Sequence, residues 1–359
     1  MSRYIIVGAG AIGGMLSAGF CRADVEHVLV ARGSQADAVE NAGLTVRTPH
    51  ETLTAHPTVV RSAAQVNLRP DDVIILAVKT QQVPTALSEW ADRPVEDEHG
   101  RQLGTAGECL PLMLFLNGTD AQEQAPRWFR TVSTTVIYTP AVYTEPGQLA
   151  VFMEDRWAGL ITGPVCGPDV PRPQAGATST ADNAALPHYL HQADRDFTAG
   201  NFASVLVPEP SPYTFGKLLA NLANGIDALV GSVDYSDLLE QLQDEARSVY
   251  EAAGIVHCPN PPEELGFADR IPEAPIDGVQ NLSSTWQSMA RGTGNIEADY
   301  LGGEIVRLAH LHGIRAPKNS LVMQWCRRVM TGDTTVPANP EERASGLREA
   351  FNHLSKEAL

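Results

Sequence analysis

Residues 4–14 read Tyr4-Ile5-Ile6-Val7-Gly8-Ala9-Gly10-Ala11-Ile12-Gly13-Gly14, an apolar run that leads directly into a glycine-rich turn. In a G-x-G-x-x-G pattern the first glycine permits a tight turn, the second lets a pyrophosphate approach the backbone, and the third lets a helix pack closely on a strand. The helix that follows would point its free amides and its positive dipole end at the phosphates. The stretch therefore predicts a dinucleotide site contacted by Gly8, Gly10, Ala11, Ile12 and Gly13.

A second apolar run, residues 27–31, arrives at the distance expected of a Rossmann-type unit and is followed by Arg32. An acidic residue near this place binds the ribose 2′-hydroxyl of NAD, whereas an arginine accommodates the 2′-phosphate of NADP. Because no acid stands at the strand end, Arg32 favours NADP(H) as the cofactor. These features indicate the cofactor class but not the reaction.

Composition excludes several classes of partner. The chain has 359 residues, enough for two domains, and its formal net charge of −17 argues against a nucleic-acid partner. Any anionic substrate would need a locally positive pocket. No apolar stretch is long enough to span a bilayer, no signal peptide is evident, and the five cysteines are scattered without a C-x-x-C pair. We expect a cytoplasmic protein with no membrane partner, and the ten histidines show no spacing typical of a metal site.

Strand and helix patterns alternate in the first part of the chain, which predicts a doubly wound α/β Rossmann-type nucleotide-binding domain over residues 1–209. Residues 148–162 read as a further hairpin that continues the sheet, and residues 163–185, rich in Pro, Gly, Ala, Ser and Thr, as a surface insertion. The strands expected are 3–7, 26–31, 58–61, 72–78, 111–116, 131–138 and 203–207, with helices at 83–90 and 186–198.

From residue 210 onward the pattern is helical, which predicts an all-α C-terminal domain over residues 210–359 that carries the substrate and catalytic groups. An active site is expected between two such domains. The amphipathic helices expected are 213–230, 235–253, 282–291, 296–312, 319–330 and 340–356.

Two polar side chains follow apolar strands of the predicted sheet. Lys79 follows the strand at 72–78, and Asn117 follows the strand at 111–116. Because ligands of open α/β sheets bind outside the carboxyl ends of the strands, both side chains would border the nicotinamide. The alternative is that Lys79 extends to solvent from a strand end and that Asn117 begins a turn.

Lys217, Asn221 and Asn224 stand at i, i+4 and i+7 on an otherwise apolar helical stretch. At 3.6 residues per turn they would share one face, and such a polar stripe is costly to bury without partners. A site wall that meets a carboxylate or a carbonyl would have this composition. The alternative is a solvated outer face, although the outer faces of this chain use Asp, Glu, Gln and Arg. Lysine, unlike arginine, readily shifts its pKa and exchanges a proton.

Taken in order, these segments resemble the ketopantoate reductase (2-dehydropantoate 2-reductase) family. The resemblance implies NADPH-dependent reduction of ketopantoate to pantoate, in the route to pantothenate and coenzyme A. It implies Lys217 as general acid and Glu297 as a site carboxylate, with Lys79 and Asn117 beside the cofactor. The groups that it implies for substrate are Asn221, Asn281 and Ser284. The matching segments are GAGAIGG (8–14), ARG (31–33), VKTQQ (78–82), LNG (116–118), KLLAN (217–221), SSTWQ (283–287) and EADY (297–300).

Several features depart from the family pattern or allow another interpretation. Leu116 stands where the family has glutamine, one residue is missing between Asn221 and Asn224, and one is added before Glu297. By themselves, Ser284 could cap a helix and Glu297 could be a first-turn carboxylate. The alternatives are therefore a related reductase of another 2-oxo acid and a non-catalytic NADP-binding sensor. The sequence leaves the oligomeric state open, with a homodimer as one option.

Overall fold

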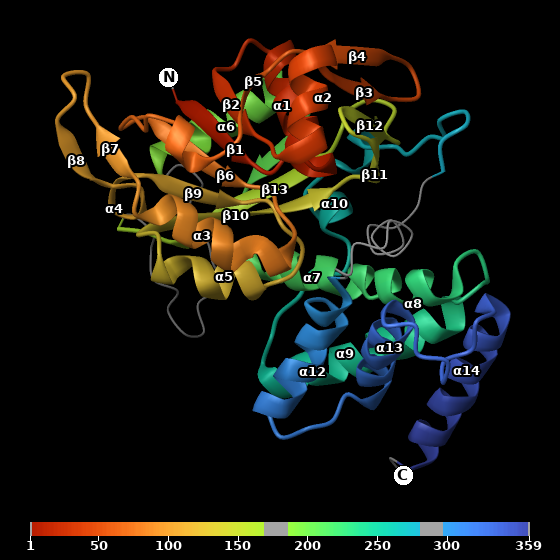
Figure 1. The fold of residues 1–359 in the computed structure, drawn as a ribbon. Coiled ribbons are helices and arrows are strands. Elements are labelled where there is room, and N and C mark those ends of the chain that lie inside the picture. Colours follow the sequence, from red (N-terminus) through yellow and green to blue (C-terminus); the bar gives the residue numbers. More distant parts are fainter. Residues whose placement is uncertain (1, 169–185, 281–296, 358–359) are drawn as a thin grey trace. The chain divides into compact units, whose positions relative to one another are not determined.

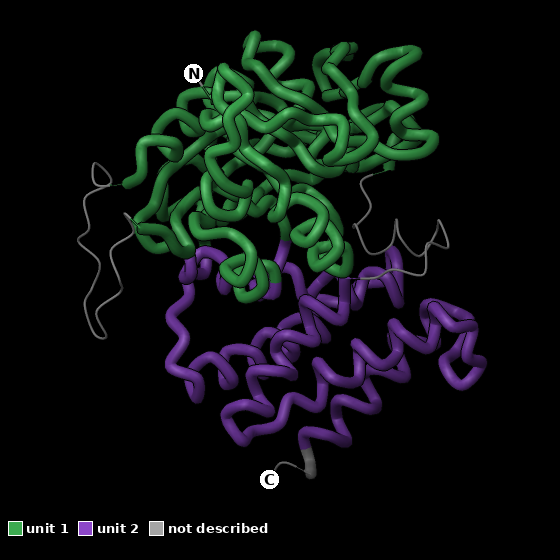
Figure 2. The backbone as a smooth tube through the Cα atoms, turned by 60° about the vertical axis from the view of Figure 1, so that its left-hand side comes forward, with its two compact units in different colours: residues 1–116, 121–210, 260–281 green, residues 117–120, 211–259, 282–359 purple. Residues whose placement is uncertain are grey.

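The chain divides into two units, which Figure 2 distinguishes by colour. The structure, a computed structural model, describes residues 2–168, 186–280 and 297–357. Unit 1 comprises Met1–Leu116, Ala121–Pro210 and Asn260–Asn281, and unit 2 comprises Asn117–Asp120, Ser211–Pro259 and Leu282–Leu359. Unit 1 is an α/β sheet domain and unit 2 is mostly helical, which confirms the predicted fold class.

An eight-stranded sheet in the order β14-β13-β10-β9-β6-β1-β2-β5 forms the centre of unit 1 (Figure 1). Neighbouring strands are parallel except for the pair β10 and β13. Its strands are β1 (Arg3–Val7), β2 (His27–Val30), β5 (Thr58–Val60), β6 (Asp72–Leu76), β9 (Pro111–Leu114), β10 (Thr131–Tyr138), β13 (Gly159–Cys166) and β14 (Ala203–Leu206).

Side chains of β1 alternate between two apolar clusters, one on each face of the sheet. Tyr4 and Ile6 belong to the cluster that includes α1 (Ala11–Arg22) and α6 (His188–Ala199), and Ile5 and Val7 belong to the one that includes α3 (Val83–Ala91). Both faces are therefore covered by helices, which explains why the strand is a continuous apolar run. Other helices of unit 1 are α2 (Gly33–Ala42), α4 (Ala106–Cys109), α10 (Pro261–Glu264) and α5 (Asp120–Gln124), of which only the first residue belongs to unit 2.

The predicted hairpin over 148–162 is wrong. Its two strands, β12 (Gln148–Val151) and β13, lie in different sheets. β12 belongs to a four-stranded sheet in the order β11-β12-β3-β4, whose residues Leu149 and Val46 share the apolar cluster of α1. The pattern was misleading because both strands are apolar and close in sequence. The strands that sequence reasoning missed are β3 (Leu44–Arg47), β4 (Thr52–Ala55), β11 (Ala141–Glu145), β7 (Pro94–Glu96) and β8 (Gln102–Thr105).

Two further segments of unit 1 differ from expectation. β13 continues to Cys166, so the predicted insertion at 163–185 begins within a strand, and its residues 169–185 lie outside the described residues. The chain leaves unit 1 after Pro210, but residues 260–281 return to it. Backbone hydrogen bonds connect this returning segment to unit 1. The Ala274 amide donates to the Phe152 carbonyl at 3.1 Å, and the Glu154 amide donates to the Pro272 carbonyl at 2.9 Å.

The helices of unit 2 pack around one apolar cluster that includes Leu218, Ile226, Leu242, Ile305 and Val322. The predicted helix at 213–230 is two helices, and the one at 296–312 is a 3-10 turn, η6, followed by a helix that begins at Gly302. The predicted helix at 282–291 lies outside the described residues. The elements are α7 (Ser211–Asn221), α8 (Ala223–Val230), α9 (Ser236–Ala253), η6 (Glu297–Asp299), α12 (Gly302–Leu311), α13 (Pro317–Met330) and α14 (Pro340–Glu357).

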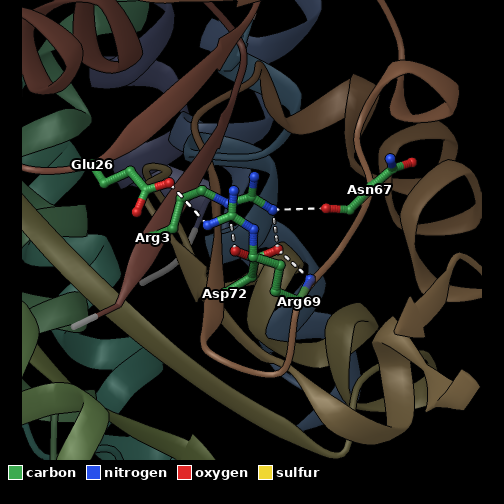
Figure 3. Close-up of polar contacts among 5 residues, drawn as sticks. All are labelled: Arg3, Glu26, Asn67, Arg69 and Asp72. Carbon is green, nitrogen blue, oxygen red and sulfur yellow. Dashed lines mark hydrogen bonds and ion pairs between the residues drawn. The ribbon is translucent and has the colours of Figure 1, made fainter. Parts of the chain in front are cut away.

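Arg3 and Asp72 form a buried ion pair between β1 and β6, at the amino ends of the strands (Figure 3). Nε and Nη2 of Arg3 each donate to an Asp72 carboxylate oxygen at 2.7 Å, and Nη2 also donates to the Asn67 carbonyl at 2.8 Å. The Arg69 amide donates to Asp72 at 2.8 Å. Hydrogen bonding to Asp72 raises the pKa of Arg3. The guanidinium therefore stays charged in the interior and depends on its partner.

Asp72→Ala is expected to lower the free energy of unfolding by about 3–5 kcal/mol, because it leaves a buried guanidinium without a counter-ion. Urea denaturation measures the change. Asp71→Ala is the control, since Asp71 is exposed, and should change stability by less than about 0.5 kcal/mol. An Asp72→Ala loss no larger than that of the control would show that the pair contributes nothing.

Candidate functional site

The glycine turn after β1 has the geometry that a pyrophosphate requires. Gly8 has φ of +107°, and a Cβ there would lie 2.5 Å from the Ala77 carbonyl oxygen. A Cβ on Gly13 would lie 1.9 Å from the Gly8 carbonyl oxygen, so only glycine lets α1 approach the turn this closely. A Cβ on Gly10 would meet nothing within 4 Å. The turn is thus tightly packed at Gly8 and Gly13 and open at Gly10.

Helix α1 begins at Ala11, and Gly10 is its N-cap without a side chain that could cap it. The first amides of a helix have no partner within the helix, and here they belong to Gly10, Ala11, Ile12 and Gly13. Gly10 is exposed and Ala11 and Ile12 are half-buried. An exposed helix N-terminus with free amides binds anions, so the residues present fit the phosphates of a dinucleotide.

Arg32 and Lys79 follow strands that flank β1 in the sheet. Arg32 is the N-cap of α2, and its guanidinium forms an ion pair with Glu89 of α3. Lys79 is half-buried, and its backbone amide donates to the Gln82 side chain at 3.1 Å. Both residues therefore lie at the carboxyl edge of the sheet, as does the glycine turn. Sequence reasoning missed Gln35 of α2, whose amide nitrogen donates to the Ala9 carbonyl of the turn at 2.8 Å.

Asn117 lies in unit 2, not in the nucleotide-binding unit where the prediction placed it. Its neighbour Thr119 is bonded within unit 2, since the Thr119 hydroxyl donates to the Glu304 carboxylate of α12 at 2.9 Å. Arg307 in turn donates to both Glu304 oxygens, at 2.6 and 2.8 Å. Thr119 and Glu304 are both buried. The only advance signal for this network was the i, i+3 spacing of Glu304 and Arg307.

Lys217 and Asn221 lie one turn apart on α7, whereas Asn224 lies on α8, so the predicted stripe spans two helices. The break follows from Leu222, whose amide bonds back to the Leu219 carbonyl three residues earlier, at 3.3 Å. Lys217 and Asn224 are half-buried, and Asn221 is only 7% exposed. Among the described residues the Asn221 amide nitrogen has no hydrogen-bond partner. This burial is unlike the solvated outer face that was the alternative.

Helix α7 is held on both sides of Lys217 by side chains of α9. The Tyr250 hydroxyl donates to the Phe215 carbonyl at 3.3 Å, and the Gln243 amide nitrogen donates to the Leu219 carbonyl at 3.2 Å. Burial raises the pKa of Tyr250, which keeps its hydroxyl protonated as a donor. A Cβ on Gly216 would lie 1.8 Å from the Cys258 carbonyl oxygen. Gly216 therefore fixes where Lys217 stands, and a glycine inside a helix pattern was its signal in the sequence.

Glu297 is buried at the start of η6, with 5% exposure. Its carbonyl accepts the amides of Tyr300 and Leu301 at 2.9 and 3.0 Å. The next residue, Ala298, belongs to the same apolar cluster as Leu218, which follows Lys217. Unit 2 thus carries Lys217, Asn221, Asn224, Glu297 and Asn117. Asn281 and Ser284 lie outside the described residues.

Across the described ranges, no group of three or more His, Cys, Asp or Glu side chains is arranged to hold a metal ion. Nor does any helix in the described part of the chain have the length and apolar character needed to cross a membrane.

Comparison with known proteins gives one family for both units. The model described as ketopantoate reductase PanE/ApbA matches residues 4–158, and the model of its C terminal matches residues 215–329. The fold is similar to that of a PanE/ApbA family ketopantoate reductase from Ralstonia eutropha, with 20% identity, a TM-score of 0.68, and coverage of 92% of this chain and 99% of the other. It is also similar to that of a D-mandelate dehydrogenase solved with NADH and anilino(oxo)acetate. Here the identity is 15% and the TM-score 0.69, with coverage of 92% of this chain and 99% of the other. A third similar structure is 2-dehydropantoate 2-reductase from Methylococcus capsulatus, with 18% identity, a TM-score of 0.66, and coverage of 92% of this chain and 97% of the other.

The contrast between Gly10 and Gly13 yields a paired test of the glycine turn. Gly10→Ala is expected to leave thermal stability unchanged, because its Cβ has open space, yet to weaken NADPH binding by about tenfold or more, because that space is the one a pyrophosphate would use. Gly13→Ala should instead destabilise the fold by about 1–3 kcal/mol through overpacking. Calorimetric titration and thermal unfolding separate the two effects. Unchanged NADPH affinity in Gly10→Ala would place the cofactor elsewhere.

Proposed function

Because the chain belongs to the ketopantoate reductase family, it is an NAD(P)-dependent oxidoreductase, and we propose that it reduces 2-dehydropantoate (ketopantoate) to pantoate with NADPH. In this proposal residues 1–209 form the dinucleotide-binding domain and residues 210–359 the substrate and catalytic domain. The reaction would serve pantothenate and coenzyme A biosynthesis. The five cysteines are all free, in keeping with a cytoplasmic enzyme.

The observation that carries the proposal is the arrangement of polar groups on unit 2. Lys217 and Asn221 come from α7, and Glu297 comes from η6, yet the apolar neighbours of all three pack in one cluster. A half-buried lysine, a buried carboxylate and a buried amide with a free donor are expensive to keep in a protein interior. They suit a site that receives a 2-oxo acid, whose carbonyl and carboxylate oxygens accept hydrogen bonds.

The reduction adds a hydride to the ketone carbon and a proton to the ketone oxygen. Bound NADPH supplies the hydride. The Lys217 ammonium donates the proton from Nζ to the oxygen as negative charge develops on it, and is then reprotonated from solvent. Proton donation by a positioned group contributes typically about 100- to 10,000-fold to the rate. In this proposal the Glu297 carboxylate, which is buried on the same unit, holds the ammonium in place.

Asn221 and Asn224 would donate hydrogen bonds to the oxygens of the substrate, together with Asn281 and Ser284. Asn117 belongs to the same unit as Asn221 and Asn224, and in this proposal its amide contacts the nicotinamide. On unit 1, the glycine turn, Arg32 and Lys79 would hold the cofactor. These cations and helix amides supply the local positive potential that a polyanionic cofactor needs on a chain with a net charge of −17.

A second candidate is a related reductase of another 2-oxo acid. The similarity to D-mandelate dehydrogenase favours it, as does Leu116 in a position where the family has glutamine. The third hypothesis is a non-catalytic NADP-binding sensor. The presence of both Lys217 and Glu297 argues against it, because a sensor would not need a proton donor.

Lys217→Ala is expected to lower kcat by about 100- to 10,000-fold, because the proton donor is lost. The affinity for NADPH should stay unchanged, because the cofactor contacts of unit 1 remain. Stopped-flow and steady-state absorbance of NADPH measure the turnover, and calorimetry measures the binding. Lys318→Ala is the matched control on the same unit, since the Lys318 ammonium binds Gln241 at 3.0 Å, and it should turn over normally. Normal turnover in Lys217→Ala would remove this residue from the chemistry.

The substrate is tested by NADPH consumption with a panel of 2-oxo acids that includes ketopantoate and benzoylformate. We expect the highest kcat/KM with ketopantoate. A preference for another acid would support the second candidate, and no consumption with any member of the panel would support the sensor.

A further inference from the structure

We propose that Glu89 of α3 sets the choice between NADPH and NADH by competing with the 2′-phosphate for Arg32, so that this enzyme accepts both dinucleotides. The inference rests on the proposed function, because it assumes that Arg32 meets the adenine ribose of the cofactor. Nothing in the glycine turn distinguishes the two dinucleotides, since they differ only at the ribose 2′ position. The choice must therefore be made by the side chains around Arg32.

The Glu89 carboxylate is held in place from two sides. One oxygen forms the ion pair with the Arg32 guanidinium, and the other accepts the Ala63 backbone amide at 3.3 Å. The Glu89 side chain is 24% exposed, whereas that of Arg32 is 61% exposed. The carboxylate is thus anchored to the body of unit 1, and the guanidinium is the more exposed partner. A phosphate that binds Arg32 must do so beside a fixed negative charge.

The neighbouring strand brings no compensating positive charge. Arg61 directly follows β5, which pairs with β2, and it stands at the same edge as Arg32. Its guanidinium bonds to both Asp37 and Glu40 of α2. Two arginines are therefore paired with three carboxylates. A 2′-phosphate adds close to two negative charges at pH 7, so this set of side chains repels it more than a free arginine pair would.

The same carboxylate suits NADH. Its ribose carries a 2′-hydroxyl, which is a hydrogen-bond donor, and an acidic side chain near the end of the second strand is the usual acceptor for it. Here the end of β2 carries Arg32, and the acid comes from α3 instead. One edge of unit 1 thus holds both an arginine for a phosphate and a carboxylate for a hydroxyl, which predicts acceptance of either cofactor.

Equilibrium binding of NADPH and NADH, followed by nicotinamide fluorescence without substrate, tests the inference. In Glu89→Gln we expect NADPH to bind about tenfold tighter and NADH several-fold weaker, because repulsion of the phosphate and acceptance of the hydroxyl are both reduced. Glu26→Gln is the matched control: it removes the same charge at the other end of β2, where Glu26 pairs with Arg69 at 3.0 Å, and should leave both affinities unchanged.

Arg32→Gln completes a double-mutant cycle with Glu89→Gln. If Glu89 acts by competing for Arg32, its effect on NADPH affinity should largely vanish once Arg32 is absent. Thermal unfolding of each variant establishes that it is folded. An NADPH-to-NADH affinity ratio in Glu89→Gln within about twofold of the wild-type value would overturn this inference alone. Failure of the wild-type protein to bind either dinucleotide would overturn the proposed function as well.

Discussion

The close approach of α1 to the turn after β1 is the constraint on which unit 1 depends. Gly13 lies so near the Gly8 carbonyl that a single added methyl group would overlap it. That contact sets the direction of α1, and α1 in turn packs against both the central sheet and the second sheet, where a Cβ on Gly14 would lie 2.8 Å from Leu149. The glycine turn, which is the proposed phosphate site, thus also joins the two sheets into one core.

In unit 2, close packing at a glycine also fixes the position of a helix, here together with side-chain hydrogen bonds. Lys217, the proposed general acid, lies on α7, which is placed by a close contact at Gly216 and by two side chains of α9 that bond to its carbonyls. One of these carbonyls, that of Leu219, also accepts the Leu222 amide in the 3-10 turn at the end of α7. The bond from Gln243 to α7 is therefore made at the turn that divides the predicted helix.

Local patterns predicted the parts of the structure that depend on local chemistry. The glycine turn, β1, β10 and the helical character of unit 2 follow from periodicity and from glycine at required positions, and they were found. Pairing between distant strands does not follow from such patterns, which is why β12 was assigned to the wrong sheet. Asn117 illustrates the same limit at the site. It follows an apolar strand, as predicted, but it belongs to unit 2, where its neighbour Thr119 bonds to Glu304, 185 residues away.

Asn221 shows how a folded chain reveals a site without a ligand. Leaving a buried donor unbonded costs about 1–3 kcal/mol, so folding alone favours a partner for each amide nitrogen. The chain provides one elsewhere in the same unit: Asn319, which is 1% exposed, donates to the Leu242 carbonyl and the Glu245 carboxylate at 3.2 and 2.8 Å. Within the described residues the Asn221 nitrogen has no such partner, although it lies one turn from Lys217. The contrast between two buried asparagines in one core shows that Asn319 is bonded within the fold, and it supports the proposal that the donor of Asn221 meets a substrate oxygen.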